Sequence, residues 1–283
     1  MKRIKRVLFI LWVVAGSFFA TGVMHTACSE TESEEEAGCF FTSGLALLAE
    51  GKIDAAIAEF TMALKLDKKN AAAYYQRAKA LEHKSDIDGA LADYTQAIKY
   101  NPSGIEAYYY RAILYQNKKL FKEAIEDNNK VIEMDDTGRE YRPHAYNNRG
   151  LVYYEKGEYK LAIDDFTRAA ELMPRMANVY YNRACAYVGR KDYGQALIYF
   201  ERELEMFPRS FVALHYSRAV RFFMNKKYSQ SWEEVMTLIK AEEQVSENFL
   251  FDLIQESGKS NLPESFPGIE EKAGVPNKAL RSW

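Results

Sequence analysis

The chain has 283 residues, of which 48% are hydrophobic and 28% are charged. This composition is typical of a globular domain and excludes a collagen-like or largely disordered chain. The formal net charge is −2, so the chain lacks the basic surplus expected of a nucleic-acid-binding protein. Three cysteines are too few for a disulfide-stabilised scaffold.

The first residues carry the pattern of an export signal, because four basic residues precede an apolar run from Val7 to Met24. Three outcomes are open for this segment. In the first, residues 1–27 are removed and Cys28 is lipidated, since Thr26-Ala27-Cys28 is similar to the cleavage box of bacterial lipoproteins. In the second, cleavage follows Gly22, and in the third the apolar run stays as a membrane span. All three place the folded part outside the cytoplasm, because the basic flank stays inside.

A polar segment follows the signal. Residues 28–36 include five glutamates and, after Cys28, no apolar side chain, so we expect a solvated and disordered acidic tether. Such a tether suits a domain held by a lipid at its first residue. Removing residues 1–27, which contain four basic residues and no acid, leaves a net charge of −6.

Beyond the tether the sequence repeats itself every 34 residues, as the spacing of Tyr74 and Tyr108 illustrates. In each repeat an aromatic residue is followed by a small residue four positions later and a large apolar residue three positions further. Tyr146, Gly150 and Tyr153 are one example. These offsets place all three side chains on one stripe of a helix, with the small residue allowing a second helix to approach.

The second half of each repeat has its own stripe of small and aromatic residues, such as Ala162, Phe166 and Ala169. Gly157 lies in the turn between the halves, and Pro174 follows the second one. The pattern resembles the tetratricopeptide repeat. The resemblance implies an all-α fold, a right-handed superhelical α-solenoid of helix-turn-helix repeats. We place repeats at 37–70, 71–104, 105–138, 143–176, 177–210 and, in degenerate form, 212–245, followed by a capping helix at 246–257 and an irregular tail at 258–283.

Two features stand out against the repeat pattern. Glu203 occupies a position where a small residue is expected, and it marks a weak point of the fifth repeat. Arginines recur in the first helices and carboxylates near the middle of the second helices. We expect these to form ion pairs between the two helices of a repeat. The arginines are Arg77, Arg111, Arg149, Arg183 and Arg218, and the carboxylates are Glu59, Asp93, Asp127, Asp165 and Glu234.

Motifs for catalysis are missing from the sequence. There is no G-x-S-x-G, no phosphate-binding loop, no H-E-x-x-H and no C-x-x-C. The histidines at 83, 144 and 215 fall in different repeats and do not converge on a metal site. We therefore predict that the protein is not an enzyme and uses no cofactor or metal.

The resemblance implies that the first helices line a concave groove in which ligands lie. Tyrosine buries a large area at low entropy cost, and asparagine can pair with a peptide backbone. We expect these side chains to face solvent and to matter little to folding. The predicted groove residues are Tyr75, Lys79, Tyr109, Tyr110, Asn147, Asn148, Tyr181 and Asn182.

The sequence thus predicts a non-enzymatic interaction scaffold in the bacterial cell envelope, similar to tetratricopeptide lipoproteins of the outer membrane. It would bind a protein or peptide and no nucleic acid, and reach the membrane through a lipid on Cys28 or an uncleaved anchor. Alternatives are an assembly factor similar to pilotins or to accessory lipoproteins of outer-membrane protein assembly, and a solute-binding protein or enzyme with its site in the groove.

Overall fold

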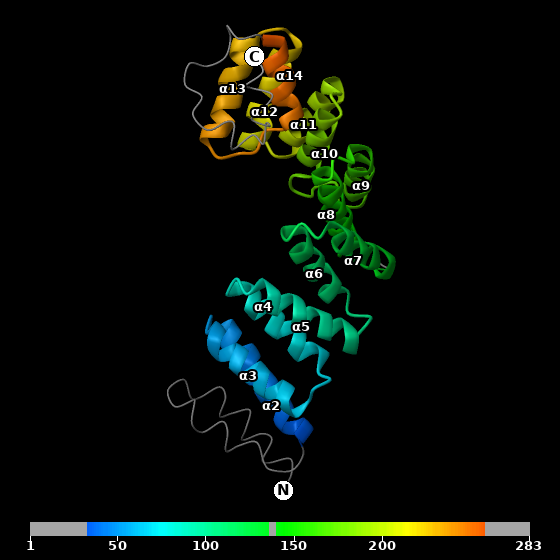
Figure 1. The fold of residues 1–283 in the computed structure, drawn as a ribbon, viewed down its shortest axis with the longest axis vertical. Helices are drawn as coiled ribbons and strands as arrows, with labels where there is room; N and C mark the ends of the chain where they lie inside the picture. The colour runs from blue at the N-terminus through cyan, green and yellow to red at the C-terminus, as the bar shows by residue number, and fades with distance from the viewer. Residues whose placement is uncertain (1–32, 136–139, 258–283) are drawn as a thin grey trace. The chain divides into compact units, whose positions relative to one another are not determined.

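A computed structural model describes residues 33–135 and 140–257. Within these ranges the chain forms helices and no strand (Figure 1), which confirms the predicted all-α repeat fold. The predicted signal 1–27, Cys28 and the tail 258–283 lie outside the described residues. The helices are α2 (Ser33–Ala49), α3 (Ile53–Leu66), α4 (Ala71–His83), α5 (Ile87–Tyr100), α6 (Ile105–Asn117), α7 (Phe121–Met134), α8 (Arg142–Glu155), α9 (Tyr159–Leu172), α10 (Val179–Gly189), α11 (Tyr193–Met206), α12 (Phe211–Met224), α13 (Tyr228–Lys240) and α14 (Glu247–Ser257).

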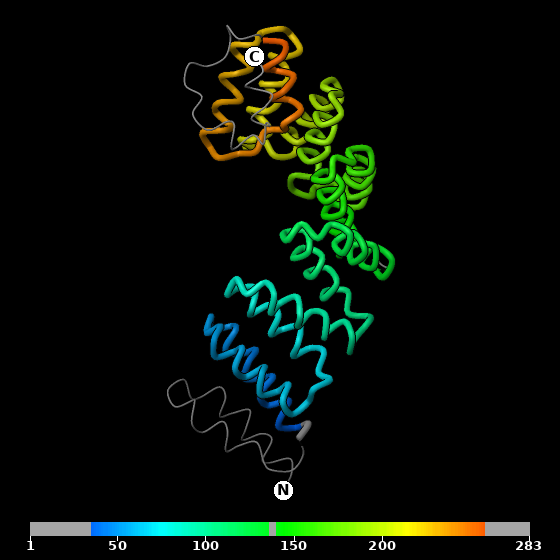
Figure 2. The backbone as a smooth tube through the Cα atoms, in the orientation of Figure 1, coloured from blue at the N-terminus to red at the C-terminus, as the bar shows by residue number. Residues whose placement is uncertain are grey.

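The chain divides into two compact units, Met1–Ala107 and Tyr108–Trp283. In the first unit, α2 pairs with α3 and α4 pairs with α5, and α3 packs on α4 (Figure 2). In the second unit the pairs are α8 with α9, α10 with α11 and α12 with α13, and each pair packs on the next. None of the described helices combines the length and the apolar character needed to cross a membrane.

The turn inside each repeat requires a residue in the left-handed region of φ. Gly51 and Gly157 supply it with φ of 74° and 76°. In other repeats the same position holds a residue with a side chain, for example Lys191 and Lys226 with φ of 62° and 57°. A Cβ is disfavoured in this region, so these lysines are strained relative to glycine.

The two helices of the fourth repeat approach most closely at Gly150. A Cβ at this position would lie 2.8 Å from a carbon of the Phe166 ring, closer than real contacts allow. Gly44 faces Phe60 in the same way, at 2.6 Å. The small residue of the first stripe therefore receives the aromatic residue of the second, as the sequence pattern predicts.

The beginning of the first described helix differs from the sequence-based expectation. Helix α2 begins at Ser33, whereas the segment 28–36 was expected to be a disordered tether. Glu35 and Glu36 thus lie in the first turn of a helix. Negative charge at a helix N-terminus is stabilised by the helix dipole, which explains why an acidic segment can be helical here.

Candidate functional site

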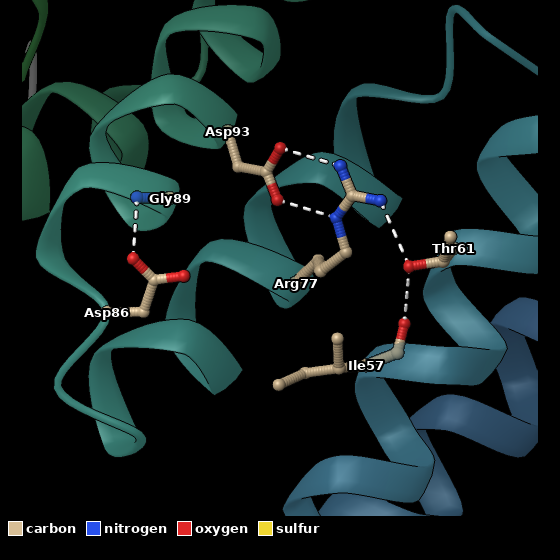
Figure 3. Close-up of polar contacts among 6 residues, drawn as sticks. All are labelled: Ile57, Thr61, Arg77, Asp86, Gly89 and Asp93. Atoms are coloured by element: carbon tan, nitrogen blue, oxygen red, sulfur yellow. Dashed lines mark hydrogen bonds and ion pairs between the residues drawn. The ribbon is translucent and has the colours of Figure 1, made fainter.

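The first helices are anchored by ion pairs to the second helices of their own repeats. In the second repeat, Arg77 donates two hydrogen bonds to Asp93, with N···O distances of 2.6 and 2.8 Å (Figure 3). Its third nitrogen donates to the hydroxyl of Thr61 in the preceding repeat at 3.1 Å. Thr61 in turn donates to the carbonyl of Ile57. One guanidinium therefore ties together three helices of the first unit, α3, α4 and α5.

The same pairing recurs in the second unit. Arg111 donates to Asp127 at 2.7 and 2.8 Å, and Arg149 donates to Asp165 at 2.7 Å through two nitrogens. Burial raises the pKa of Asp127 and Asp165, and the arginines oppose that rise. The predicted structural role of these arginines is confirmed by this bidentate geometry.

The fifth repeat lacks this ion pair. Tyr199 occupies the position of the carboxylate, and the guanidinium carbon of Arg183 lies 4.0 Å from the centroid of the Tyr199 ring. The Nε of Arg183 is buried and has no hydrogen-bond partner among the described residues. Stacking on an aromatic ring replaces the ion pair here.

Three rings from α6 and from the start of α8 gather around Tyr109. Its centroid lies 5.2 Å from that of Tyr110 and 5.3 Å from that of Tyr141, both edge to face, and 6.4 Å from that of His144. Burial raises the pKa of Tyr109, and the nearby Asn148 amide opposes part of that rise. The Nδ2 of Asn148 is nevertheless buried without a hydrogen bond of ordinary geometry. The structure thus joins three predicted groove residues, Tyr109, Tyr110 and Asn148, to two that the prediction missed, Tyr141 and His144.

A second contact joins the fourth and fifth repeats. The Nδ2 of Asn182 donates to the Oδ1 of Asn147 at 3.1 Å. This bond uses one donor and one acceptor of the amide pair. The remaining amide nitrogen of Asn147 and oxygen of Asn182 are complementary to a peptide C=O and N–H.

Tyr181 lies deeper than the sequence-based prediction expected. Its ring packs 5.8 Å from that of Phe200, and the side chain belongs to the apolar cluster of the fifth and sixth repeats. It also forms a hydrogen bond with the buried thiol of Cys185, whose pKa is raised to about 12 by burial. The expectation that Tyr181 matters little to folding stays a prediction, but its side chain is half-buried rather than open to solvent. The reason is that α11 places an aromatic ring directly beneath it.

Tyr75 and Lys79 belong to α4 in the first unit. The ammonium of Lys79 lies 5.6 Å from the centroid of the Tyr75 ring, and Tyr75 also contacts Tyr94. The structure thus brings these two predicted residues together within one repeat.

Tyr141, which the prediction missed, has one feature in the sequence that points to it. Tyr141 lies in the four residues, 139–142, that interrupt the repeat spacing, and α8 begins within them at Arg142. Because this insertion directly precedes a first helix, its aromatic residue could have been included among the predicted groove residues. Among the described residues no group of histidine, cysteine and carboxylate side chains is arranged to hold a metal ion.

Comparison with family models covers most of the repeats. Two models described as tetratricopeptide repeat match residues 75–139 and 141–209, and one described as TPR repeat matches residues 44–85. The matched segments include the helices that carry every predicted groove residue. No curated protein sequence matches the chain.

Solved structures with the same repeat superpose on much of the chain. A tetratricopeptide repeat protein from Parabacteroides merdae ATCC 43184 has a TM-score of 0.63 at 18% identity and covers 88% of this chain and 97% of its own. YrrB, a TPR protein with an unusual peptide-binding site, has a TM-score of 0.60 at 20% identity, covering 68% and 96%. Pseudomonas aeruginosa pilF has a TM-score of 0.59 at 17% identity, covering 74% and 93%. The superpositions show that these proteins share a fold with this chain.

Proposed function

Because the chain is a tetratricopeptide repeat protein, we propose that it is a non-enzymatic scaffold that binds a segment of another protein on its first helices. Repeats of this kind bury their apolar faces against their neighbours and leave an extended surface for partners. The solved structure of YrrB is described as having a peptide-binding site, which supports this class of function.

The amide pair of Asn147 and Asn182 is the observation that carries the proposal. The amide nitrogen of Asn147 and the amide oxygen of Asn182, which this bond does not use, are one donor and one acceptor that could pair with a peptide backbone. Tyr109 and the rings around it supply aromatic area near Asn148, the residue that follows Asn147 in the chain. Aromatic side chains of this kind usually dominate the energy of a protein interface.

Affinity capture with matched variants tests this proposal. The wild-type protein, a Tyr109→Ala, Asn147→Ala double variant and a Leu161→Ala control would be used to capture proteins from bacterial envelope extracts. Leu161 is exposed on the second helix α9. We expect the double variant to retain at least tenfold less partner, because losing a hot spot costs about 2 kcal/mol or more, and the control to retain as much as wild type. Equal capture by all three proteins would refute the proposed site.

We also propose that the protein works in the cell envelope, attached to a membrane through lipid on Cys28. The export signal and the cysteine before an acidic segment support this location. Labelling with a fatty-acid analogue in cells that express wild type or Cys28→Ala tests it. Label on wild type alone is the expected result, and equal labelling of both would end the lipid proposal.

A narrower alternative within the same class is an assembly factor for an envelope complex. The identity of the captured partner separates the two: a secretin or a component of outer-membrane assembly favours the assembly role, and a hydrolase or protease favours the scaffold.

A further inference from the structure

Helix α14, the last helix that the structure describes, packs against α10 and α13, and its apolar side chains join a cluster that also includes residues of α12 (Figure 1). The ring of Phe249 lies 5.8 Å from that of Tyr216 on α12, and the N–H of Ser246 donates to the Tyr216 hydroxyl at 2.9 Å. Tyr216 holds, in the sixth repeat, the position that Tyr109 holds in the third. Helix α14 therefore covers in the last repeats the surface that we propose binds a partner in the third and fourth.

Helix α14 has the form of an amphipathic ligand. Phe249, Leu250 and Leu253 are almost completely buried and belong to one cluster with residues of α10 and α12. Gln255 is exposed on the other side of the helix. Leu250, Leu253 and the partly buried Ile254 stand at i, i+3 and i+4, a spacing by which an amphipathic helix docks into an apolar groove.

Polar contacts fix the register of α14. Asp252 accepts hydrogen bonds from the ammonium of Lys191 and from the hydroxyl of Tyr193, the latter at 2.6 Å. The Nδ2 of Asn248 donates to the carbonyl of Gly189 at 2.8 Å. These three partners lie at the turn of the fifth repeat, so that turn recognises a carboxylate and an amide on the helix.

Helix α14 is joined to α13 by a short connection and borders a surface cavity. Residues 241–246 join it to α13, a short connection that gives α14 a high effective concentration at its own site. A surface cavity of about 450 Å³ borders the helix and is lined in part by Tyr193, Phe223 and Asp252. The cavity shows that α14 covers this surface incompletely.

We propose that this surface of the fifth and sixth repeats is a helix-binding site, that α14 is its internal ligand, and that a partner docks there through an amphipathic helix by displacing α14. The partner helix carries large apolar residues at i, i+1 and i+4 and a carboxylate at i+3, matching Phe249, Leu250, Leu253 and Asp252. The inference extends the proposed partner-binding function to a second surface.

A labelled peptide with the sequence of residues 244–257 serves as the probe, and fluorescence anisotropy measures its binding to the full chain. The wild-type protein should bind it weakly, because the site is free only in the fraction of molecules with α14 released. Asp252→Ala removes the contacts with Lys191 and Tyr193 and should tighten binding at least tenfold. Gln255→Ala, an exposed change on the same helix, should bind as wild type does. A peptide with Leu250→Asp and Leu253→Asp should bind no variant.

Locking α14 provides the opposite test. A carbodiimide joins the Lys191 amine to the Asp252 carboxyl as an amide, while the reagent takes up the water that is lost. The locked protein should no longer bind the peptide. Lys191→Arg, treated in the same way, cannot form this amide and should keep the affinity that it has before treatment.

Hydrogen exchange over 247–257 and circular dichroism show whether α14 is released while the repeats stay folded. Phe249→Ala is a second releasing variant should Asp252→Ala leave the helix protected. Peptide binding that is the same in the wild-type, releasing and locked proteins would overturn the inference. So would a variant in which α14 is released but the peptide binds no more tightly. Hydrogen-exchange protection of 247–257 that persists in both Asp252→Ala and Phe249→Ala would also overturn it. The proposed partner site is tested separately by capture with Tyr109→Ala, Asn147→Ala, a variant that should bind this peptide as wild type does.

Discussion

The carboxylate of Glu203 on α11 accepts a hydrogen bond from the backbone N–H of Tyr181 at 3.3 Å, and the backbone N–H groups of Asn178 and Tyr180 point to the same carboxylate. Glu203 is only 1% exposed. Asn178, the N-cap residue of α10, has a φ of 65° and its side chain makes no capping bond. A residue from the next helix thus caps the start of α10. The position that looked like a weak point in the sequence is a buried tie between two helices.

The burial of Glu203 predicts that the stability of the folded state depends on pH. Burial raises the pKa of Glu203 above its ordinary value of 4.5, and the backbone N–H groups oppose the rise. A folded state that holds the proton more tightly than the unfolded state loses stability as pH rises from 4.5 to the folded-state pKa. Gln cannot ionise and keeps an oxygen acceptor. The Tm of Glu203→Gln minus that of wild type should therefore be larger at pH 7 than at pH 4.

Glu203→Ala is the control for this prediction, because it removes the acceptor and should lower the Tm at both pH values. A Gln variant whose Tm difference from wild type is the same at pH 4 and pH 7 would show that Glu203 does not titrate in this range.

Because Arg149 and Asp165 form a buried ion pair, we expect the stability effects of substituting them to depend strongly on each other. The two side chains are 19% and 7% exposed. Arg149→Leu leaves a buried carboxylate without its partner and should lower the free energy of unfolding by about 3 kcal/mol. Adding Asp165→Leu should recover part of the loss, because no charge is then buried. Chemical denaturation of the single and double variants measures both effects.

Arg168 provides the comparison. It pairs with Glu171 at 2.9 Å, but both side chains are more than half exposed. Arg168→Leu should change stability by roughly 1 kcal/mol or less. A loss as large as that of Arg149→Leu would contradict the role assigned to burial.

A substitution at Gly150 tests whether the fourth and fifth repeats stabilise each other. Gly150→Leu places a side chain where even a Cβ would lie 2.8 Å from the Phe166 ring, so α8 and α9 must separate. Overpacking of this kind costs about 1–3 kcal/mol. Because neighbouring repeats stabilise each other, hydrogen exchange should increase in residues 177–210 as well as in 143–176.

Gly194→Leu is the matched control, since a Cβ there meets no other atom within 4 Å and little change in exchange is expected. Faster exchange confined to 143–176 in Gly150→Leu would show that the fourth and fifth repeats are not coupled.

The turn at Lys226 predicts a stabilising substitution. Its φ of 57° is disfavoured for a residue with a Cβ. Glycine removes a cost of about 1–2 kcal/mol but adds a loss of chain entropy of about 0.5–1 kcal/mol. Lys226→Gly should therefore raise the free energy of unfolding by roughly 0.5–1 kcal/mol. Gly157→Lys, at the equivalent turn, should lower it, and urea denaturation of both variants checks the signs.

The sequence by itself determined the all-α repeat fold, the small residue at Gly150 facing Phe166, and the arginine–carboxylate pairs of the second, third and fourth repeats. These features depend on spacing within one repeat, and a repeated spacing is visible in a single chain. The burial of Phe249, Leu250 and Leu253 is consistent with helical periodicity in the same way.

Only the tertiary structure decided several contacts within and between repeats. It placed Tyr181 against Phe200, gave Glu203 a helix to cap, gathered Tyr141 and His144 around Tyr109, and set α14 against α10 and α13. Each of these depends on how neighbouring helices or the segment after the last repeat pack in space. Periodicity along one chain shows which side of a helix is apolar, but the packing of the helices decides what covers it.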